Sequence, residues 1–167
     1  MAAHATNGLS TVFIAVHPHC PCTRATVANL ERALNGPAQD CKVVALIYTP
    51  KNAASNWAAT DTVERLNGFG ATAVTDIDGQ TAASLGMKTS GQVVCYGRDG
   101  SLAFSGGVTP SRGHEGDCAG LDHLRDVLTG HAAQAHPSTP PASEVYGCPL
   151  CNDPALSICG VPPGGRK

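Results

Sequence analysis

The chain has 167 residues, a mass of 17.0 kDa and a formal charge of −2. This length predicts one domain of ordinary size with a short appendage, and a core large enough to fold without disulfide bonds. Aromatic residues make up only 4% of the chain, and Lys and Arg are not gathered in one stretch. The composition therefore argues against base stacking and phosphate-backbone binding, and we expect no nucleic-acid partner.

No stretch of the sequence predicts a membrane span. The longest strongly apolar runs, residues 12–16 and 43–48, are far shorter than the roughly 20 residues that a membrane helix needs. The first ten residues carry neither the basic nor the apolar stretch of a secretory signal. The expected location is cytoplasmic by default, or periplasmic or membrane-tethered if an N-terminal segment has been removed.

The chain begins with the pattern of a buried strand followed directly by a helix. The strand is the apolar run at residues 12–16, which ends at a His-Pro pair. From Thr23 onward, Val27, Leu30 and Leu34 recur at helical spacing. The Asn-Gly-Pro sequence that follows predicts the end of this helix.

A second strand and helix follow. Residues 42–49 are almost continuously apolar, which is typical of a central strand with both faces covered. The next helix ends at Gly68, and its Asp61 and Glu64 have the spacing of a capping box. Residues 71–75 predict a third, short strand.

The last part of the domain predicts a hairpin and a helix. Residues 92–96 and 101–105 have the strand composition of an antiparallel hairpin. A glycine-rich loop at 106–116 leads to a final helix, with Asp117 as the predicted N-cap and Gly130 at its end.

Composition divides the chain into four segments, because a Pro, Ser and Ala stretch without a packing pattern follows the last helix. The segments are a flexible N-terminus at 1–10, a folded domain at 11–130, a linker at 131–144 and a cysteine-containing tail at 145–167.

Eight cysteines and seven histidines are the unusual feature of the composition. At the predicted start of the first helix, unpaired N–H groups and the helix dipole stabilise a thiolate relative to a thiol. His17 and His19 would add to this effect when protonated. Cys20 or Cys22 should therefore be more reactive than an ordinary buried cysteine. The close pairs in the chain are Cys20 with Cys22, and Cys148 with Cys151.

This order of elements, with cysteines between the first strand and the first helix, resembles the thioredoxin fold over residues 11–130. The resemblance implies an α/β domain of three layers, α/β/α, with a mixed sheet of four to five strands and flanking helices. Many thioredoxins carry Cys-x-Pro-Cys, whereas residues 19–22 read His-Cys-Pro-Cys. A disulfide in the contracted Cys-Pro-Cys ring should be strained and easily reduced.

A second departure from the thioredoxin pattern lies at residues 89–92. Thioredoxins place a cis-proline there, beside the active-site sulfurs, whereas this chain reads Thr-Ser-Gly-Gln. The missing proline predicts a weakened dock for a substrate thiol, and it leaves room for a metal ion at the cysteines.

Several motifs are similar to the thioredoxin-like proteins of bacteria called RedB, which implies a thiol-redox domain. These motifs are HPHCPCTRAT at 17–26, TSGQV at 89–93, FSGGVTPSRGHEGD at 104–117 and YGCPL at 146–150.

The sequence thus predicts a thiol/disulfide redox protein, acting as an oxidoreductase or as a redox sensor on a protein client. Cys20 is the expected attacking thiolate, because Cys22 should lie deeper in the helix, and the neighbouring cysteine would resolve the mixed disulfide. His19 would tune the thiolate or shuttle a proton. No organic cofactor is implied.

Two other interpretations stay open. One is a zinc or copper carrier or sensor, since imidazole and thiolate groups suit both metals; the other is a partner-binding scaffold without chemistry. The candidate metal ligands are His17, His19, Cys20, Cys22, Cys148 and Cys151.

Further cysteines and one loop have weaker predictions. The tail pair is either an unstructured thiol-bearing tail or a resolving pair for Cys20 and Cys22, which the linker is long enough to allow. Cys41 and Cys95 fall in predicted strands and are expected to be core thiols. The loop at 109–117 is either a solvated connector or a contact for a substrate or an anion.

Overall fold

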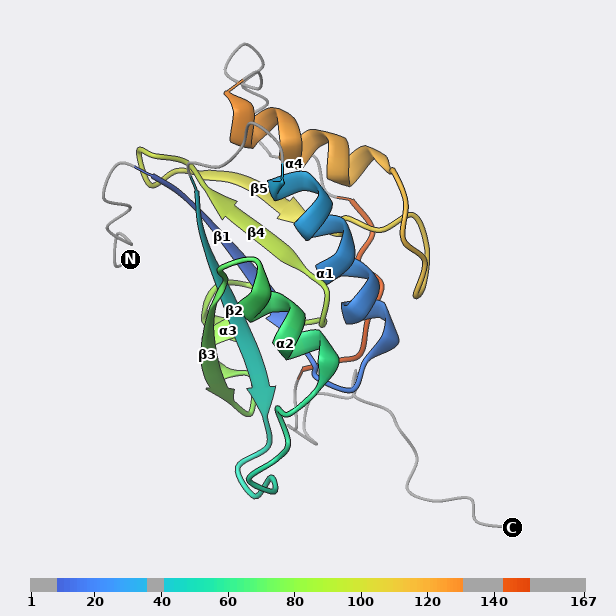
Figure 1. Cartoon of the computed structure of the whole chain (residues 1–167). Helices are drawn as coiled ribbons and strands as arrows, with labels where there is room; N and C mark the ends of the chain where they lie inside the picture. The colour runs from blue at the N-terminus through green and yellow to red at the C-terminus, as the bar shows by residue number, and fades with distance from the viewer. Residues whose placement is uncertain (1–8, 36–40, 131–142, 151–167) are drawn as a thin grey trace.

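The computed structural model describes residues 9–35, 41–130 and 143–150. Their centre is a five-stranded mixed sheet in the order β3-β2-β1-β4-β5 (Figure 1). The strands are β1 (Ser10–Val16), β2 (Cys41–Thr49), β3 (Thr72–Ile77), β4 (Val93–Tyr96) and β5 (Leu102–Gly106). The helices are α1 (Pro21–Leu34), α2 (Asp61–Gly68), α3 (Gln80–Ser84) and α4 (Ala119–Thr129).

The sheet joins a parallel half to an antiparallel half. Strands β1, β2 and β3 run parallel, and the connections between them include α1 and α2. Strand β4 pairs antiparallel with β1, and β5 pairs antiparallel with β4. Strand β1 therefore lies in the middle of the sheet, and α1 begins just after its C-terminal end.

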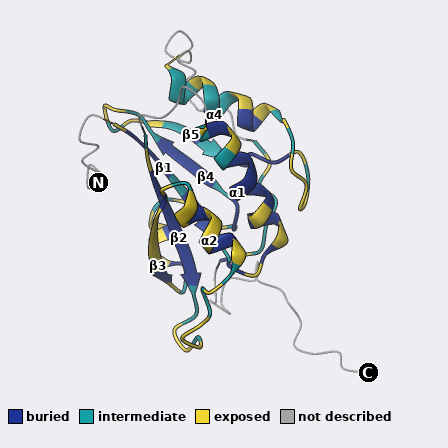
Figure 2. Cartoon of the chain, in the orientation of Figure 1, coloured by how far each residue is buried: buried dark blue, intermediate teal, exposed yellow. Residues whose placement is uncertain are grey.

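Alternating residues of β1 point to the two faces of the sheet, as the two-residue period of a strand requires. Val12, Ile14 and Val16 join the core under α1, α2 and α4, while Ala15 joins a second core with α3 and Leu150. Figure 2 shows β2 and β4 as largely buried between these layers. The predicted three-layer α/β/α class with a mixed sheet and flanking helices is confirmed.

Two predicted helix starts are displaced by one residue. Thr60 and not Asp61 is the N-cap of α2, so Asp61 and Glu64 do not occupy the positions of a capping box. Cys118 and not Asp117 is the N-cap of α4. Asp117 instead pairs with Arg32 of α1, at 2.9 Å between Nη2 and Oδ1, and with Arg125 of α4 at 3.5 Å.

The predicted linker at 131–144 and the end of the tail fall mostly outside the described residues. Residues 143–150 are described and pack on the domain, where Leu150 is only 3% exposed. This segment, which joins the end of the predicted linker to the start of the predicted tail, is therefore part of the folded unit around the sheet.

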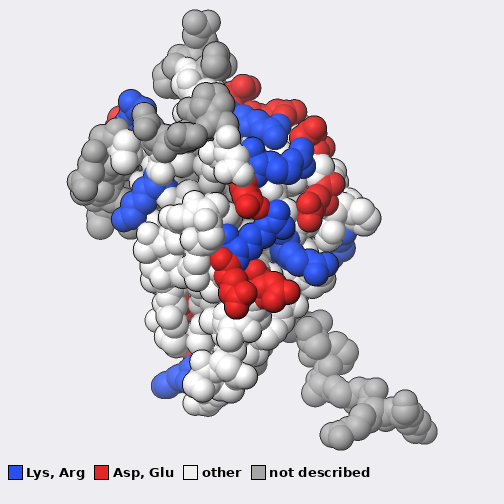
Figure 3. All heavy atoms as spheres, viewed as in Figure 1, with Lys and Arg blue, Asp and Glu red and all other residues white. Residues whose placement is uncertain are grey.

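Charges are mixed on the face shown in Figure 3, where Lys and Arg lie among Asp and Glu. Ion pairs among the described residues include those of Arg32 and Arg125, both with Asp117, and that of Arg65 with Glu31. Among the described helices, none combines the length and the apolar character needed to cross a bilayer.

Candidate active site

Cys20 lies at the N-terminus of α1, directly after the turn that follows β1. It is the N-cap residue, with extended backbone angles, and Pro21 takes the first helical position. Proline suits that position because its ring sets φ and the helix needs no N–H there. The next N–H groups of the first turn have no carbonyl partner inside the helix, so they can donate hydrogen bonds to the side chain of the N-cap residue.

Hydrogen bonds hold the pKa of the Cys20 thiol low. Burial by itself raises this pKa, but the Ser90 hydroxyl, the Thr23 backbone N–H and the Cys148 thiol oppose it and lower the pKa to about 7. Each of these groups stabilises the thiolate more than the thiol, since a charged acceptor makes the stronger bond. The Cys20 thiolate is therefore favoured near neutral pH compared with an ordinary cysteine.

The Thr23 side chain adds a further donor at the same place. Its Oγ1 is buried, and no hydrogen bond to another described group satisfies it. The hydroxyl contributes to the lowered pKa of Cys20. A buried donor without another partner stabilises a nearby thiolate.

Cys22 differs from Cys20 in charge state and not in exposure. Cys22 is 7% exposed and Cys20 is 3% exposed, so both are buried and the expectation that Cys22 lies deeper is wrong. Burial raises the pKa of Cys22, and the neighbouring charge of Cys20 raises it further. The Gly113 backbone and the charge of Arg112 oppose this rise without cancelling it. These directions support Cys20 as the attacking thiolate.

The loop at 109–117 is tied to α1 by Asn29. The buried Asn29 side chain donates to the carbonyls of Val108 and Gly116, at 2.7 and 2.9 Å, and accepts from the Gly116 N–H at 3.1 Å. These bonds hold the loop beside the start of α1, where Gly113 and Arg112 act on Cys22. The loop is therefore a built part of the thiol site.

His17 and His19 lie against an aromatic cluster on the other side of the turn. The His17 ring stacks on Tyr48 with centroids 5.4 Å apart, and the His19 ring meets the edge of Trp57 at 4.5 Å. Burial lowers the pKa of His17, and the charge of His19 lowers it further. Neither histidine is among the groups that shift the pKa of Cys20.

Two roles are predicted for His19, tuning of the Cys20 thiolate and proton transfer, and replacement of His19 tests the first. We expect His19→Ala to leave the pH midpoint of Cys20 alkylation unchanged, because the His19 ring faces Trp57. The same variant should change Trp57 fluorescence, since a ring contact at 4.5 Å is lost. A shift of the alkylation midpoint would instead support the tuning role.

The third thiol at the site comes from the tail. The Cys148 thiol donates to the Cys20 sulfur, with the two Sγ atoms 3.2 Å apart. The Cys148 N–H also donates to Ser90 Oγ at 2.9 Å. Ser90 thus touches both the attacking cysteine and the segment that carries Cys148.

The predicted metal ligands come together only in part. Cys20, Cys22 and Cys148 are close, the two histidines face Trp57, and Cys151 lies outside the described residues. In the part of the chain that the structure describes, no three His, Cys, Asp or Glu side chains are arranged to hold a metal ion.

The two predicted core thiols lie away from the site. Cys95 is fully buried in β4, and burial together with the charge of Cys41 raises its pKa to about 12. Cys41 is half-buried at the start of β2 and packs against the same core. These surroundings agree with a packing role.

The residues that activate Cys20 are hard to find from the sequence. Ser90 lies in the segment that departs from the cis-proline pattern, but nothing near it in the sequence marks its hydroxyl as a partner of Cys20. Thr23 follows Cys20 by three positions, and a polar residue at this distance from an N-cap cysteine is a local signal that points to the site.

Three solved structures show what the fold resembles, and none exceeds 18% identity. An uncharacterised conserved protein from Geobacillus kaustophilus matches with a TM-score of 0.64 and 17% identity, over 88% of this chain and 79% of its own. A secreted Mycobacterium tuberculosis disulfide oxidoreductase, homologous to Escherichia coli DsbE, matches with a TM-score of 0.51 and 18% identity, over 74% and 82%. A Neisseria meningitidis protein assigned to the thioredoxins gives 0.51 and 14%, over 77% and 83%.

The chain has a thioredoxin-like fold. No family model and no curated protein matches it. The predicted superfamily resemblance is therefore confirmed at the level of the fold, and the RedB-type resemblance stays a prediction. In this thioredoxin-like domain Cys20, Cys22 and Cys148 lie close together near the start of α1, where β1 ends.

Proposed function

We propose that this protein exchanges thiols and disulfides with a protein client through Cys20, as a RedB-type redox protein. The observation that carries the proposal is the set of donors around the Cys20 sulfur, which hold its pKa at about 7 while the other cysteines at the site are shifted upward. A thiolate present at neutral pH is the nucleophile of disulfide exchange.

The proposed reaction has two steps. The Cys20 thiolate attacks one sulfur of a client disulfide, forms a mixed disulfide and releases the other client sulfur as a thiolate. A second thiol of this chain then attacks Cys20, and the remaining client sulfur leaves. Cys22 and Cys148 are the two candidates for this second step, since both interact with Cys20.

The fold gives independent support for this class of chemistry. A solved neighbour with the same fold is described as a disulfide oxidoreductase. Helix N-termini favour thiolates, and Cys20 occupies that position here.

Single-cysteine replacements test the proposal. Cys20→Ser is expected to abolish reduction of a disulfide-bonded model peptide, and Cys118→Ser, at a half-buried thiol outside the site, is the matched control that should not slow it. Elemental analysis of the purified chain belongs in the same experiment. The proposal would be contradicted if Cys20→Ser reduced the model peptide at the wild-type rate. It would also be contradicted if the active protein held a metal ion that blocks Cys20.

A further inference from the structure

The piece of the tail at residues 143–150 pairs with the domain beside Cys20. The Ser90 N–H donates to the Cys148 carbonyl at 2.8 Å, and the Leu150 N–H donates to the Lys88 carbonyl at 3.1 Å. Thr89 and Pro149 form an antiparallel bridge between these two bonds. This docked segment therefore lies as a short added strand along residues 88–90.

The backbone of the docked segment approaches the backbone of the domain closely at two glycines. A Cβ placed on Gly147 would meet the Ser90 carbonyl oxygen at 1.8 Å. A Cβ on Gly107 would meet the Glu144 carbonyl oxygen at 2.0 Å. Only glycine permits these contacts, so the segment and the domain are shaped to each other.

Both ends of the docked segment are anchored. The buried Leu150 packs in the core with Ala82 and Met87. At the other end, Ser143 and Gly107 exchange hydrogen bonds: the Ser143 hydroxyl donates to the Gly107 carbonyl at 2.7 Å, and the Gly107 N–H donates to the Ser143 carbonyl at 3.3 Å. These anchors fix Cys148 between them.

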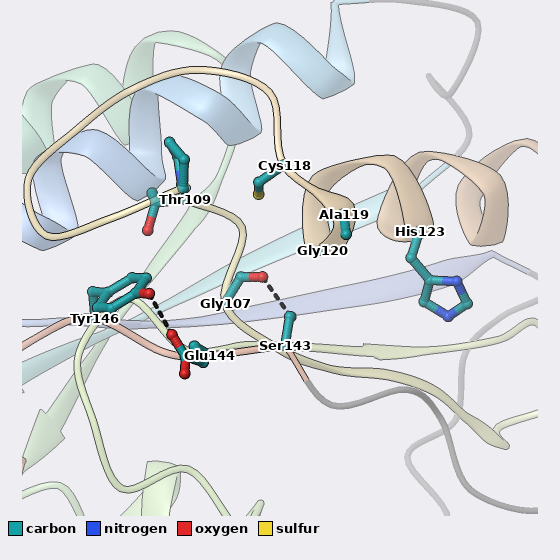
Figure 4. A pocket seen from close by; sticks show the side chains of 10 residues that line it. Gly107, Thr109, Cys118, Ala119, Gly120, His123, Ser143, Glu144 and Tyr146 are labelled. Atoms are coloured by element: carbon teal, nitrogen blue, oxygen red, sulfur yellow. Dashed lines mark hydrogen bonds between the residues drawn. The ribbon is translucent and has the colours of Figure 1, made fainter.

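A pocket of about 480 Å³ lies beside the Ser143 anchor, between the docked segment and the start of α4 (Figure 4). Ser143, Glu144 and Tyr146 line one side, and the Tyr146 hydroxyl donates to the Glu144 carboxylate. Cys118 and His123 line the α4 side. This space is therefore open on the side of the segment that carries Ser143, Glu144 and Tyr146, while Gly147 and Cys148 lie against the domain.

The geometry favours Cys148 over Cys22 as the thiol that reacts with Cys20. The sulfurs of Cys148 and Cys20 are 3.2 Å apart, compared with about 2.05 Å in a disulfide. Cys148 comes from a separate strand, so a bond to Cys20 closes no small ring. Cys22 is joined to Cys20 through Pro21 alone, and a disulfide there would have to form within the first turn of α1.

We propose that Cys148 is the resolving cysteine, and that the docked segment holds it against Cys20 so that exchange ends in a Cys20–Cys148 disulfide. This inference rests on the proposed exchange activity of Cys20. It assigns the second step to a residue 128 positions away in the chain.

Atoms and electrons balance in this scheme. Cys148 attacks the Cys20 sulfur of the mixed disulfide, the Cys20–Cys148 bond forms, and the bond to the client sulfur breaks. The two thiols of this chain lose two electrons and two protons, and the client disulfide gains them as two thiols. A dithiol reductant, by the reverse exchange, returns the chain to its starting state.

The protonation of Cys148 suits this order of events. Burial raises its pKa, and the bond to Cys20 and the charge of Cys20 raise it further, to about 11. Protonated Cys148 therefore serves first as a donor to the Cys20 thiolate. Once Cys20 is in a mixed disulfide, its charge is gone, which removes one of the causes that raise the pKa of Cys148 and so favours its ionisation and attack.

Reaction with a limiting amount of an aromatic disulfide such as DTNB tests the assignment. In the wild type we expect both halves of the reagent to be released and a Cys20–Cys148 peptide to be found by mass mapping. Cys148→Ser should release one half and keep the other on Cys20. Cys22→Ser should still yield the Cys20–Cys148 peptide, and Cys151→Ser controls for the neighbouring tail thiol.

Gly147→Ala tests the docked segment with every thiol retained. The added methyl collides with the Ser90 backbone, so we expect less Cys20–Cys148 disulfide and, at alkaline pH where Cys20 is ionised, faster alkylation of Cys20. Gly68→Ala is the matched control, because a Cβ there meets nothing within 4 Å. It should leave both quantities unchanged.

The outcomes separate the two proposals. A Cys20–Cys22 disulfide in the wild type, with full release in Cys148→Ser, would overturn the role of Cys148 and leave the exchange activity of Cys20 intact. Release of reagent by Cys20→Ser at the wild-type rate would overturn the proposed function itself.

Discussion

Ser90→Ala is expected to raise the pKa of Cys20 and to slow its alkylation roughly tenfold at pH values below 7. The Ser90 hydroxyl is the strongest of the groups that lower this pKa. A hydrogen bond to a charged group contributes about 1.5–3 kcal/mol, and about 1.4 kcal/mol corresponds to one pKa unit and thus to a tenfold change in the thiolate fraction.

The size of this effect depends on pH. In the wild type the rate should rise through pH 7 and then level off, because the folded pKa of Cys20 is about 7. In Ser90→Ala the same rise should come at higher pH, so the two profiles differ most on the acid side. The midpoint of the profile reports the pKa, while the alkaline plateau reports access to the sulfur.

The control for this experiment is Ser101→Ala, which removes an exposed hydroxyl bonded to Asp99 at 2.7 Å, far from the site. Its profile should match the wild type. If the midpoint of Ser90→Ala also matched the wild type, the pKa of Cys20 would have to depend on other groups.

The second large effect is expected for Asn29→Ala, which should lower the free energy of unfolding by on the order of 3 kcal/mol. The fully buried Asn29 amide satisfies two carbonyls and one N–H of the loop that covers Cys22. Alanine leaves these backbone groups without their partners, and each unsatisfied buried group costs about 1–3 kcal/mol. Urea unfolding with an unchanged slope would measure the loss.

Arg65→Ala is the matched control for stability. Arg65 pairs with Glu31 at 2.6 Å, but its side chain is 40% exposed. Exposed ion pairs contribute about 0–1 kcal/mol, so little change is expected. An equal loss of unfolding free energy in the two variants would contradict this prediction. The buried Asn29 amide would then stabilise the protein no more than the exposed ion pair does.

The missing proline at residues 89–92 takes on a different meaning in the structure. The sequence predicts a weakened dock for a substrate thiol there, and in the structure the Ser90 N–H pairs with the backbone of this chain's own Cys148 at 2.8 Å. Gly91, at a φ of +80°, lets the chain turn there, and no cis peptide bond occurs among the described residues. Main-chain groups thus hold a thiol-bearing strand without the proline.

The same contacts bear on access to the site. Cys20 is only 3% exposed while the docked segment is in place. A client disulfide can reach the sulfur when the segment moves aside, and the segment must return for Cys148 to react. The proposed cycle therefore includes an opening and a closing of residues 143–150.

The sequence by itself determined the order of strands and helices and the place of Cys20 at a helix start. These features depend on residues close together in the chain: the apolar run of β1, the helical spacing of Val27 and Leu30, and the proline that follows Cys20. Local periodicity and helix-start chemistry are readable because each acts over a few residues.

The tertiary structure decided which groups surround the Cys20 sulfur. Ser90 and Cys148 reach it from segments distant in sequence, and Cys148 reaches Ser90 across 58 positions. The rings of His17 and His19 contact Trp57, although their proximity to the cysteines in the sequence predicted that they would act on the thiols. Sheet pairing and side-chain packing fix these choices, and neither leaves a signal within a single stretch of sequence, because a contact between distant segments depends on both at once.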